Sequence, residues 1–214
     1  VAAYGGGALT MSGQIDTSKP YASSAPDAGN AWLQGSSVNA TGDIVANGAG
    51  YTGGQGGNIN IHGTGGGVSA GYISARGGYG ASGAGYMAGA GGNLAITAAS
   101  GTISIAGPIH VGGGHAQSAS SAGVLPYGGG AGGNVSITLS NPSGGIQVTN
   151  IIDTRGGSGG TNSLANAGAI GGKGGDGGNV TITTNGNYGG FFNIGSINAD
   201  RGANGYSTFN PPND

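Results

Sequence analysis

The sequence contains no cysteine, little charge and few large aromatic side chains. Without cysteine, the chain can form neither a disulfide framework nor a thiolate metal site. Only five Lys or Arg and seven Asp or Glu occur among 214 residues, so Ser, Thr, Asn and backbone groups must solvate the surface. With three Phe and one Trp, a conventional globular core is hard to assemble. We therefore expect a core of small apolar side chains that is stacked many times.

Other absences exclude whole classes of function. The net charge of −2 provides no basic patch, so nucleic-acid binding is not expected. No apolar run approaches the roughly 18 to 20 residues of a membrane-spanning helix. The chain begins at Val1 without a signal-like segment, which is typical of a mature protein after signal cleavage or of a fragment. These features favour an extracellular or cell-surface location, and absence of cysteine does not contradict secretion.

Glycine is abundant, with 56 residues, and it opens a short repeated unit of Gly, any residue, Ile and two small or polar residues, with Asn150 in place of Gly in one copy. The isoleucines of successive copies lie 29 to 45 residues apart. They are Ile15, Ile44, Ile73, Ile109, Ile152 and Ile197. Such a recurrence predicts one supersecondary unit per repeat, with the isoleucines stacked as a core ladder.

Two further elements belong to each repeat. A pair of alternating apolar positions precedes each isoleucine, as in Ile103 and Ile105, and alternation of this kind predicts a half-buried strand. A third alternating element begins at an asparagine, usually after two glycines, and a degenerate copy covers residues 30–33. The corner asparagines are Asn58, Asn93, Asn134 and Asn179, which we expect to form a hydrogen-bonded ladder.

Three short strands per repeat predict an all-β fold, a parallel β-solenoid of about six coils that forms one domain over residues 1–214. Glycine-rich loops should leave the same corner of every coil and stack beside the solenoid. They cover residues 18–29, 47–57, 76–92, 112–133 and 155–178. Two conformations are open to them, disorder or extended polyproline-II-like segments packed through glycine, and the regular spacing of glycine favours order.

Several motifs suggest chemistry. Residues 174–179 resemble a calcium-binding nonapeptide, but Asn replaces the required Asp and the repeat is too long, so we predict structural corners and neither a metal site nor a cofactor. Carboxylates and arginines also recur near the isoleucines, at Asp16, Asp43, Asp153, Asp200, Arg76, Arg155 and Arg201. A solvated row of charges is the favoured interpretation, and an acid–base site is the alternative. The three histidines, His62, His110 and His115, share no ligand spacing and are expected at the surface.

Tyrosines are the candidate binding residues. Five of them lie in the corner loops: Tyr21, Tyr51, Tyr79, Tyr86 and Tyr127. Their amphipathic rings suit contacts with carbohydrate or protein. The alternative is that each ring covers the glycine-rich layer as a local core.

The pattern Gly-Gly-Asn-Val-Thr-Ile-Thr, followed by Gly-x-Ile-x-Ile and Gly-x-Ile-x-Ala-x-Gly-Gly, resembles the repeat region of filamentous-haemagglutinin-type β-helical proteins. It is also similar to large Gly, Asn and Thr-rich bacterial surface proteins. The likeness covers about residues 9–202. It implies a secreted surface protein used in adhesion or matrix building, although those proteins have many more coils and begin with a secretion domain that this sequence lacks.

We therefore predict a non-enzymatic, extracellular structural or adhesive protein. Neither terminus has the pattern of an amphipathic cap, so open strand edges should pair end to end and form a filament. Its expected partners are further copies of itself, surface glycans or other matrix proteins. The alternatives are a carbohydrate- or ice-binding solenoid module and a polysaccharide-lyase-like enzyme.

Overall fold

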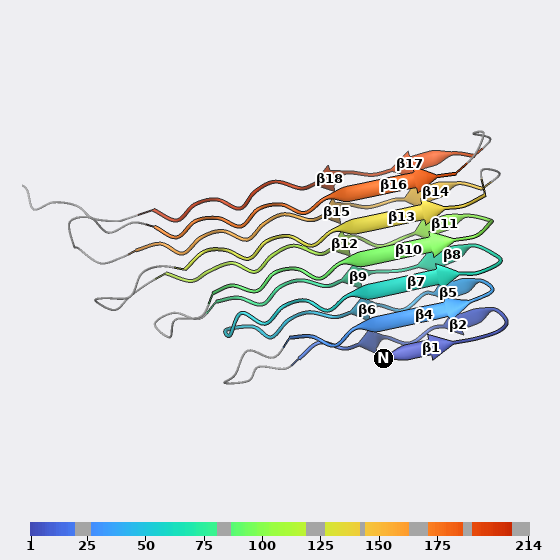
Figure 1. The fold of residues 1–214 in the computed structure, drawn as a ribbon, viewed down its shortest axis with the longest axis horizontal. Helices are drawn as coiled ribbons and strands as arrows, with labels where there is room; N and C mark the ends of the chain where they lie inside the picture. The colour runs from blue at the N-terminus through green and yellow to red at the C-terminus, as the bar shows by residue number, and fades with distance from the viewer. Residues whose placement is uncertain are drawn as a thin grey trace, which may run out of the picture.

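Three parallel sheets of six strands form the body of the protein in the computed structural model (Figure 1). The structure describes residues 1–19, 27–80, 87–118, 127–141, 144–162, 171–185 and 190–206. Within these residues there is no helix, and hence none that could cross a membrane. Each of the six coils contributes one strand to every sheet, which confirms the predicted parallel β-solenoid.

The strands follow one another in a fixed order around each coil. Sheet A contains β1 (Ala2–Tyr4), β4 (Ala31–Gly35), β7 (Ile59–Gly63), β10 (Leu94–Ala98), β13 (Val135–Leu139) and β16 (Val180–Thr184). Sheet B contains β2 (Leu9–Met11), β5 (Val38–Ala40), β8 (Val68–Ala70), β11 (Ile103–Ile105), β14 (Ile146–Val148) and β17 (Phe192–Ile194). Sheet C contains β3 (Ile15–Asp16), β6 (Ile44–Val45), β9 (Ile73–Ser74), β12 (Ile109–His110), β15 (Ile152–Asp153) and β18 (Ile197–Asn198). The sequence pattern had not indicated β1.

The isoleucines of sheet C pair in register from coil to coil. Ile44, Ile73, Ile109 and Ile152 are 0% exposed, because a coil covers them on each side. Ile197 departs from the predicted buried ladder, since its side chain is 49% exposed. Its strand β18 lies at the edge of sheet C, where no strand of the described chain packs on its outer side.

Sheet A shows why the alternating pattern specifies its two faces. Ile59 pairs with Leu94, and Ile61 pairs with Ile96, and all four side chains are buried. The residues between them point to the opposite face, because successive side chains of a strand alternate. Apolar ladders therefore fill the inside of the coil, and the outside of sheet A is left to polar residues and a few aromatic rings.

Asparagine side chains connect the coils at the corner before sheet A. The Asn58 N–H donates to Oδ1 of Asn30 at 2.8 Å, and the Asn93 N–H donates to Oδ1 of Asn58 at 3.0 Å. The same bond, at 2.9 Å, joins Asn134 to Asn93 and Asn179 to Asn134. Each side chain thus satisfies a backbone donor of the next coil, which fixes the corner and the register of the following strand.

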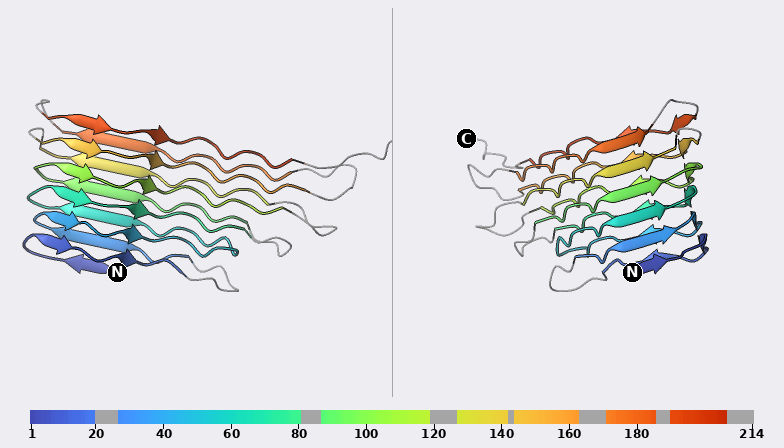
Figure 2. Two further views of the ribbon diagram at one scale, coloured as in Figure 1. Left: turned by 180° about the vertical axis from the view of Figure 1, so that it is seen from behind. Right: turned by 45° about the vertical axis from the view of Figure 1, so that its right-hand side comes forward.

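Each connection between sheets C and A leaves the solenoid as an outgoing segment and comes back as a returning segment that runs alongside it. All these connections extend in the same direction (Figures 1 and 2). We call the described parts of these segments, within 17–29, 46–57, 75–92, 111–133 and 154–178, together with 199–206 after β18, the glycine layer. Its hydrogen bonds recur at every third residue. In the fifth coil, Gly172, Gly175 and Gly178 donate to the carbonyls of Gly160, Gly157 and Thr154, each at 2.8 Å. A period of three is that of polyproline II, so the described parts of these segments are ordered with a polyproline-II-like periodicity.

Glycine is required in this layer because neighbouring backbones touch. A Cβ atom on Gly157 would lie 1.7 Å from the Gly114 carbonyl oxygen, and one on Gly130 would lie 1.8 Å from that of Gly89. These separations are far shorter than any real contact of a side chain. The residues that donate the bonds between outgoing and returning segments are therefore glycines.

Candidate functional site: a polar groove beside sheet C

A groove of about 860 Å³ follows the stack where sheet C continues into the outgoing segments of the glycine layer. Its side chains come mainly from the first, third and sixth positions after the isoleucines of sheet C. The third and sixth positions share one face, since the outgoing segments have three residues per turn. Arg76 and Arg155 occupy third positions, and Tyr79, His115 and Ser158 occupy sixth positions.

Asp153 is the centre of a charged cluster in this groove. Nε and a terminal nitrogen of Arg155 donate to its two carboxylate oxygens, each at 2.9 Å. The Arg155 backbone N–H adds a bond of 3.2 Å to Oδ1, so the carboxylate also closes a local turn. Arg76 comes from two coils away and places its terminal nitrogen 4.0 Å from Oδ2. The cluster therefore joins the third and fifth coils across the fourth.

Arg155 determines the ionisation state of Asp153 in this cluster. Burial alone would raise the pKa of the Asp153 carboxyl, but the hydrogen bonds and charge of Arg155 outweigh this effect and hold the pKa below its usual value. The same pairing raises the pKa of Arg155. Asp153 is therefore a carboxylate at neutral pH. Because both of its oxygens already accept bonds from Arg155, it is poorly disposed to take a proton from a substrate.

His110 belongs to the same cluster and is not the surface residue that the sequence predicted. Its side chain is 18% exposed, and Nδ1 lies 3.5 Å from Oδ2 of Asp153. The Tyr72 ring packs edge-on against it, with 5.8 Å between the ring centroids. Burial and the charge of Arg76 lower the pKa of His110, against the opposing effect of Asp153. Neutral imidazole is therefore the favoured form at neutral pH.

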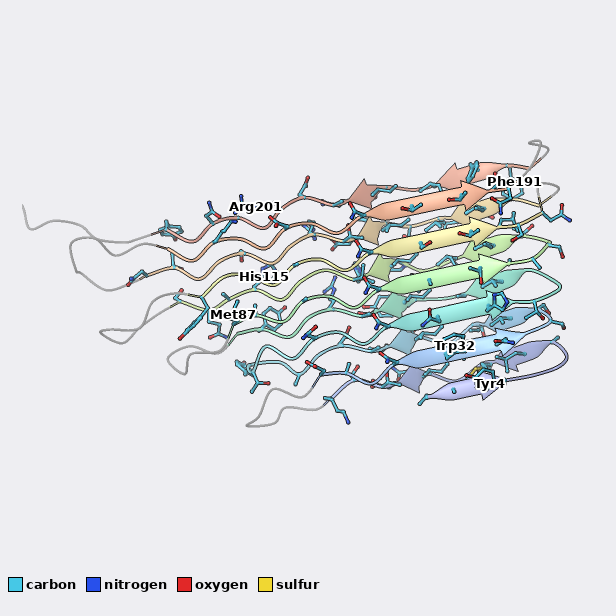
Figure 3. All side chains as sticks on the ribbon, viewed as in Figure 1. Tyr4, Trp32, Met87, His115, Phe191 and Arg201 are labelled. Atoms are coloured by element: carbon cyan, nitrogen blue, oxygen red, sulfur yellow. The ribbon has the colours of Figure 1, made fainter. Side chains whose placement is uncertain are left out.

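An aromatic pair lies farther out along the groove. The rings of Tyr79 and His115 are stacked with centroids 5.8 Å apart and an interplanar angle of 26°. The Ser158 N–H donates to Nδ1 of His115 at 2.9 Å, so the ring is held from the neighbouring coil. Tyr79 remains 51% exposed and offers its ring to solvent. Figure 3 shows His115 and Arg201 on the glycine layer, away from the strands.

The few charges of the chain concentrate in this groove. Four of the five Lys and Arg residues line it, namely Lys19, Arg76, Arg155 and Arg201, and three of the seven acidic residues do so, namely Asp16, Asp153 and Asp200. The groove therefore carries a formal charge of +1, whereas the rest of the chain has one basic and four acidic residues. The excess of basic over acidic side chains in the groove favours an anion there.

No known family, curated protein or solved structure matches this chain.

A second surface lies on the outer face of sheet A. Trp32 is 43% exposed and Tyr4 is 67% exposed, on the adjacent strands β4 and β1 (Figure 3). A shallow hollow of about 320 Å³ beside Trp32 is lined by Gln34, Asn60 and His62 among others. This combination of a ring with amide and imidazole groups was missed in the sequence, because these residues belong to two different coils.

The predicted tyrosine set does not form one site. Tyr79 lines the groove, whereas Tyr51 is exposed at a loop tip with a φ of 64°. Tyr127 is half-buried in the glycine layer. Tyr21 and Tyr86 lie outside the described residues. Among the carboxylates, Asp43 does not line the groove, although Asp16 and Asp200 do.

Proposed function

We propose that this chain is an extracellular structural and adhesive protein whose coils continue from one copy to the next. The observation that carries the proposal is the contrast between inner and end coils. Ile152 and Ile146 are 0% exposed, whereas their partners in the last coil, Ile197 and Phe192, are 49% and 44% exposed. Apolar side chains that an additional coil would bury are thus presented on the end of the stack.

The strand edges support the same proposal. Strands β16, β17 and β18 lie at one end of the three sheets, and β1, β2 and β3 lie at the other. Edge strands present unpaired backbone groups to which another strand can bond. Because all the pairings are parallel, the last coil of one copy matches the first coil of another in strand direction and order. Coil-on-coil stacking of copies would therefore extend all three sheets together.

The test is the size distribution of the purified 214-residue chain as its concentration rises, measured by light scattering and by electron microscopy. We expect filaments, and we expect Ile197→Asp to suppress them because it places a charge on the contact. Met87→Asp is the matched control, since Met87 is 66% exposed on the glycine layer, away from the end coil (Figure 3). A wild-type chain that stays monomeric at every concentration would refute the proposal.

Carbohydrate binding is the second candidate function, and the groove is the observation that favours it. An elongated, polar hollow with an exposed tyrosine ring suits a chain of sugars better than a compact ligand. This function is compatible with the first, because a filament would repeat the groove along its length.

A further inference from the structure

We propose that the groove binds a linear polysaccharide that carries carboxylate groups, a polyuronate, with its chain running along the stack of coils. This inference deepens the adhesive part of the proposed function by naming a ligand class. It does not depend on end-to-end assembly, because the groove lies within one copy.

The direction of the bound chain follows from the spacing of the cations. Lys19, Arg76 and Arg155 belong to the first, third and fifth coils, and Arg201 belongs to the sixth. Coils of a parallel solenoid are about 4.8 Å apart, so a chain along the stack meets the first three of these cations at intervals of about 10 Å and Arg201 one coil farther on. A ligand lying across the groove would meet only the residues of one or two coils. The recurring cations therefore favour an extended polymer parallel to the stack.

The charge density of the groove favours carboxylates at low density. Asp153 is already paired with Arg155, whereas Arg76 is 46% exposed and 4.0 Å from the same carboxylate, which leaves its donors accessible. A guanidinium fork matches a carboxylate in shape. Asp16 and Asp200 also line the groove, where they would repel a densely sulfated chain but accept bonds from sugar hydroxyls. A polysaccharide with one carboxylate per sugar, separated by hydroxyl groups, therefore matches the mixture of basic and acidic side chains in the groove.

The aromatic pair supplies the apolar part of the site. A sugar ring has an apolar face and polar edges, so it can lie on an exposed aromatic ring while its hydroxyls bond to neighbouring polar groups. The exposed Tyr79 ring is held by His115, and His115 is held by Ser158. The platform is therefore set before the ligand arrives, which reduces the entropy lost on binding.

Binding should be measured by calorimetry with polygalacturonate oligomers, in a buffer that contains a chelator so that calcium does not crosslink the ligand. The double variant Arg76→Gln, Arg201→Gln removes two half-exposed cations. We expect it to bind at least about tenfold more weakly, as the loss of charge-assisted hydrogen bonds requires. Lys173→Gln is the matched control for each charge change, because Lys173 is exposed outside the groove, and it should change affinity by less than about twofold.

Neutral cello-oligosaccharides and dextran sulfate provide the comparison ligands. Weak or absent binding of both, beside clear binding of the uronate, supports the proposal. Equal binding of the neutral chain, tighter binding of the sulfated chain, no binding of the uronate or equal losses in Lys173→Gln would each overturn it. Light scattering on the same samples reports assembly separately, so failure of the filament proposal would not be mistaken for failure of this one.

Discussion

The β-solenoid and the glycine layer share the same coils but are stabilised by different parts of the chain. In the solenoid, ladders of fully buried isoleucine, leucine and valine side chains fill the interior. In the glycine layer, backbone hydrogen bonds of about 2.8 to 3.0 Å connect segments that have almost no side chains between them. Each repeat therefore contains two regions with different sources of stability. Burial of side chains stabilises its solenoid part, and close backbone contact stabilises its part of the glycine layer.

The largest expected effect is in the solenoid. Ile109→Asp would bury a charge among apolar neighbours, because Ile109 is 0% exposed and lies between Ile73 and Ile152. We expect a loss of about 3 to 5 kcal/mol in the free energy of unfolding, enough to unfold a marginal domain. Chemical denaturation followed by circular dichroism measures this loss.

The matched control is Ser104→Asp on β11, whose side chain is half-buried on the outer face between Ser69 and Gln147. It should cost less than about 1 kcal/mol. His110, although adjacent to Ile109, is unsuitable because an aspartate there would face Asp153. Equal midpoints for Ile109→Asp and Ser104→Asp would contradict the inward register of sheet C.

An intermediate effect is expected in the glycine layer. Gly157→Ala would bring a methyl group within 1.7 Å of the Gly114 carbonyl oxygen, so the backbone must move. We expect a cost of about 1 to 3 kcal/mol, as for other overpacked sites. Hydrogen exchange should quicken at Gly157 and Gly175, whose amides bond across the layer, and stay slow at Ile109 in the solenoid.

Gly29→Ala serves as the comparison, because the nearest atom to its added methyl group, Cβ of Thr17, is at an ordinary distance of 3.5 Å. It should leave both stability and exchange nearly unchanged. If amide hydrogen exchange were equally fast in Gly29→Ala and Gly157→Ala, close packing would not be the reason for glycine in this layer.

The smallest effect is expected at the junction of the two regions, where His110 packs against Asp153. The folded protein lowers the pKa of His110, so the unfolded chain binds more protons over the window below the ordinary histidine pKa of 6.5. Stability should therefore fall as the pH is lowered from about 7 through this window. Asp153, whose pKa is also lowered, should add a second loss below its ordinary value of 3.8.

Denaturation midpoints of the wild type and His110→Gln between pH 7 and pH 3 test this expectation. The variant should lose the part of the decline that begins below pH 6.5 and keep the part due to Asp153. A pH profile identical to that of the wild type would show that His110 contributes nothing to it.

The sequence was sufficient to predict the coil and its ladders. Ile109 and the residues around it carry the period of two that marks a strand, and Asn93 marks a corner through the glycines before it. These signals are local, since each depends on residues within one repeat. The degenerate copy at residues 30–33 also lies in a strand, β4. Polyproline-II order was one of two open alternatives, because glycine spacing alone does not show which backbone lies beside which.

The site could be predicted only in part. The recurrence of Arg76 and Arg155 near the isoleucines was visible in the sequence, but their meeting at Asp153 depends on loops of different length returning to the same register. His110 appeared isolated because its partners belong to other coils. Neighbours across coils are 28 to 45 residues apart in the sequence, and no local pattern reports on them.

Because the outgoing segments have three residues per turn, positions that can vary lie on a different face from the positions that glycine occupies. In the inner coils, positions whose backbone touches another backbone are occupied by glycine, whereas the third and sixth positions after Ile73, Ile109 and Ile152 carry Arg76, Gly112 and Arg155, or Tyr79, His115 and Ser158. Substitutions at the third and sixth positions can therefore change one face of each outgoing segment without disturbing the backbone contacts of the glycine layer. Lineages that share this scaffold would be expected to diverge fastest along that face, so that recognition evolves while the framework stays constant.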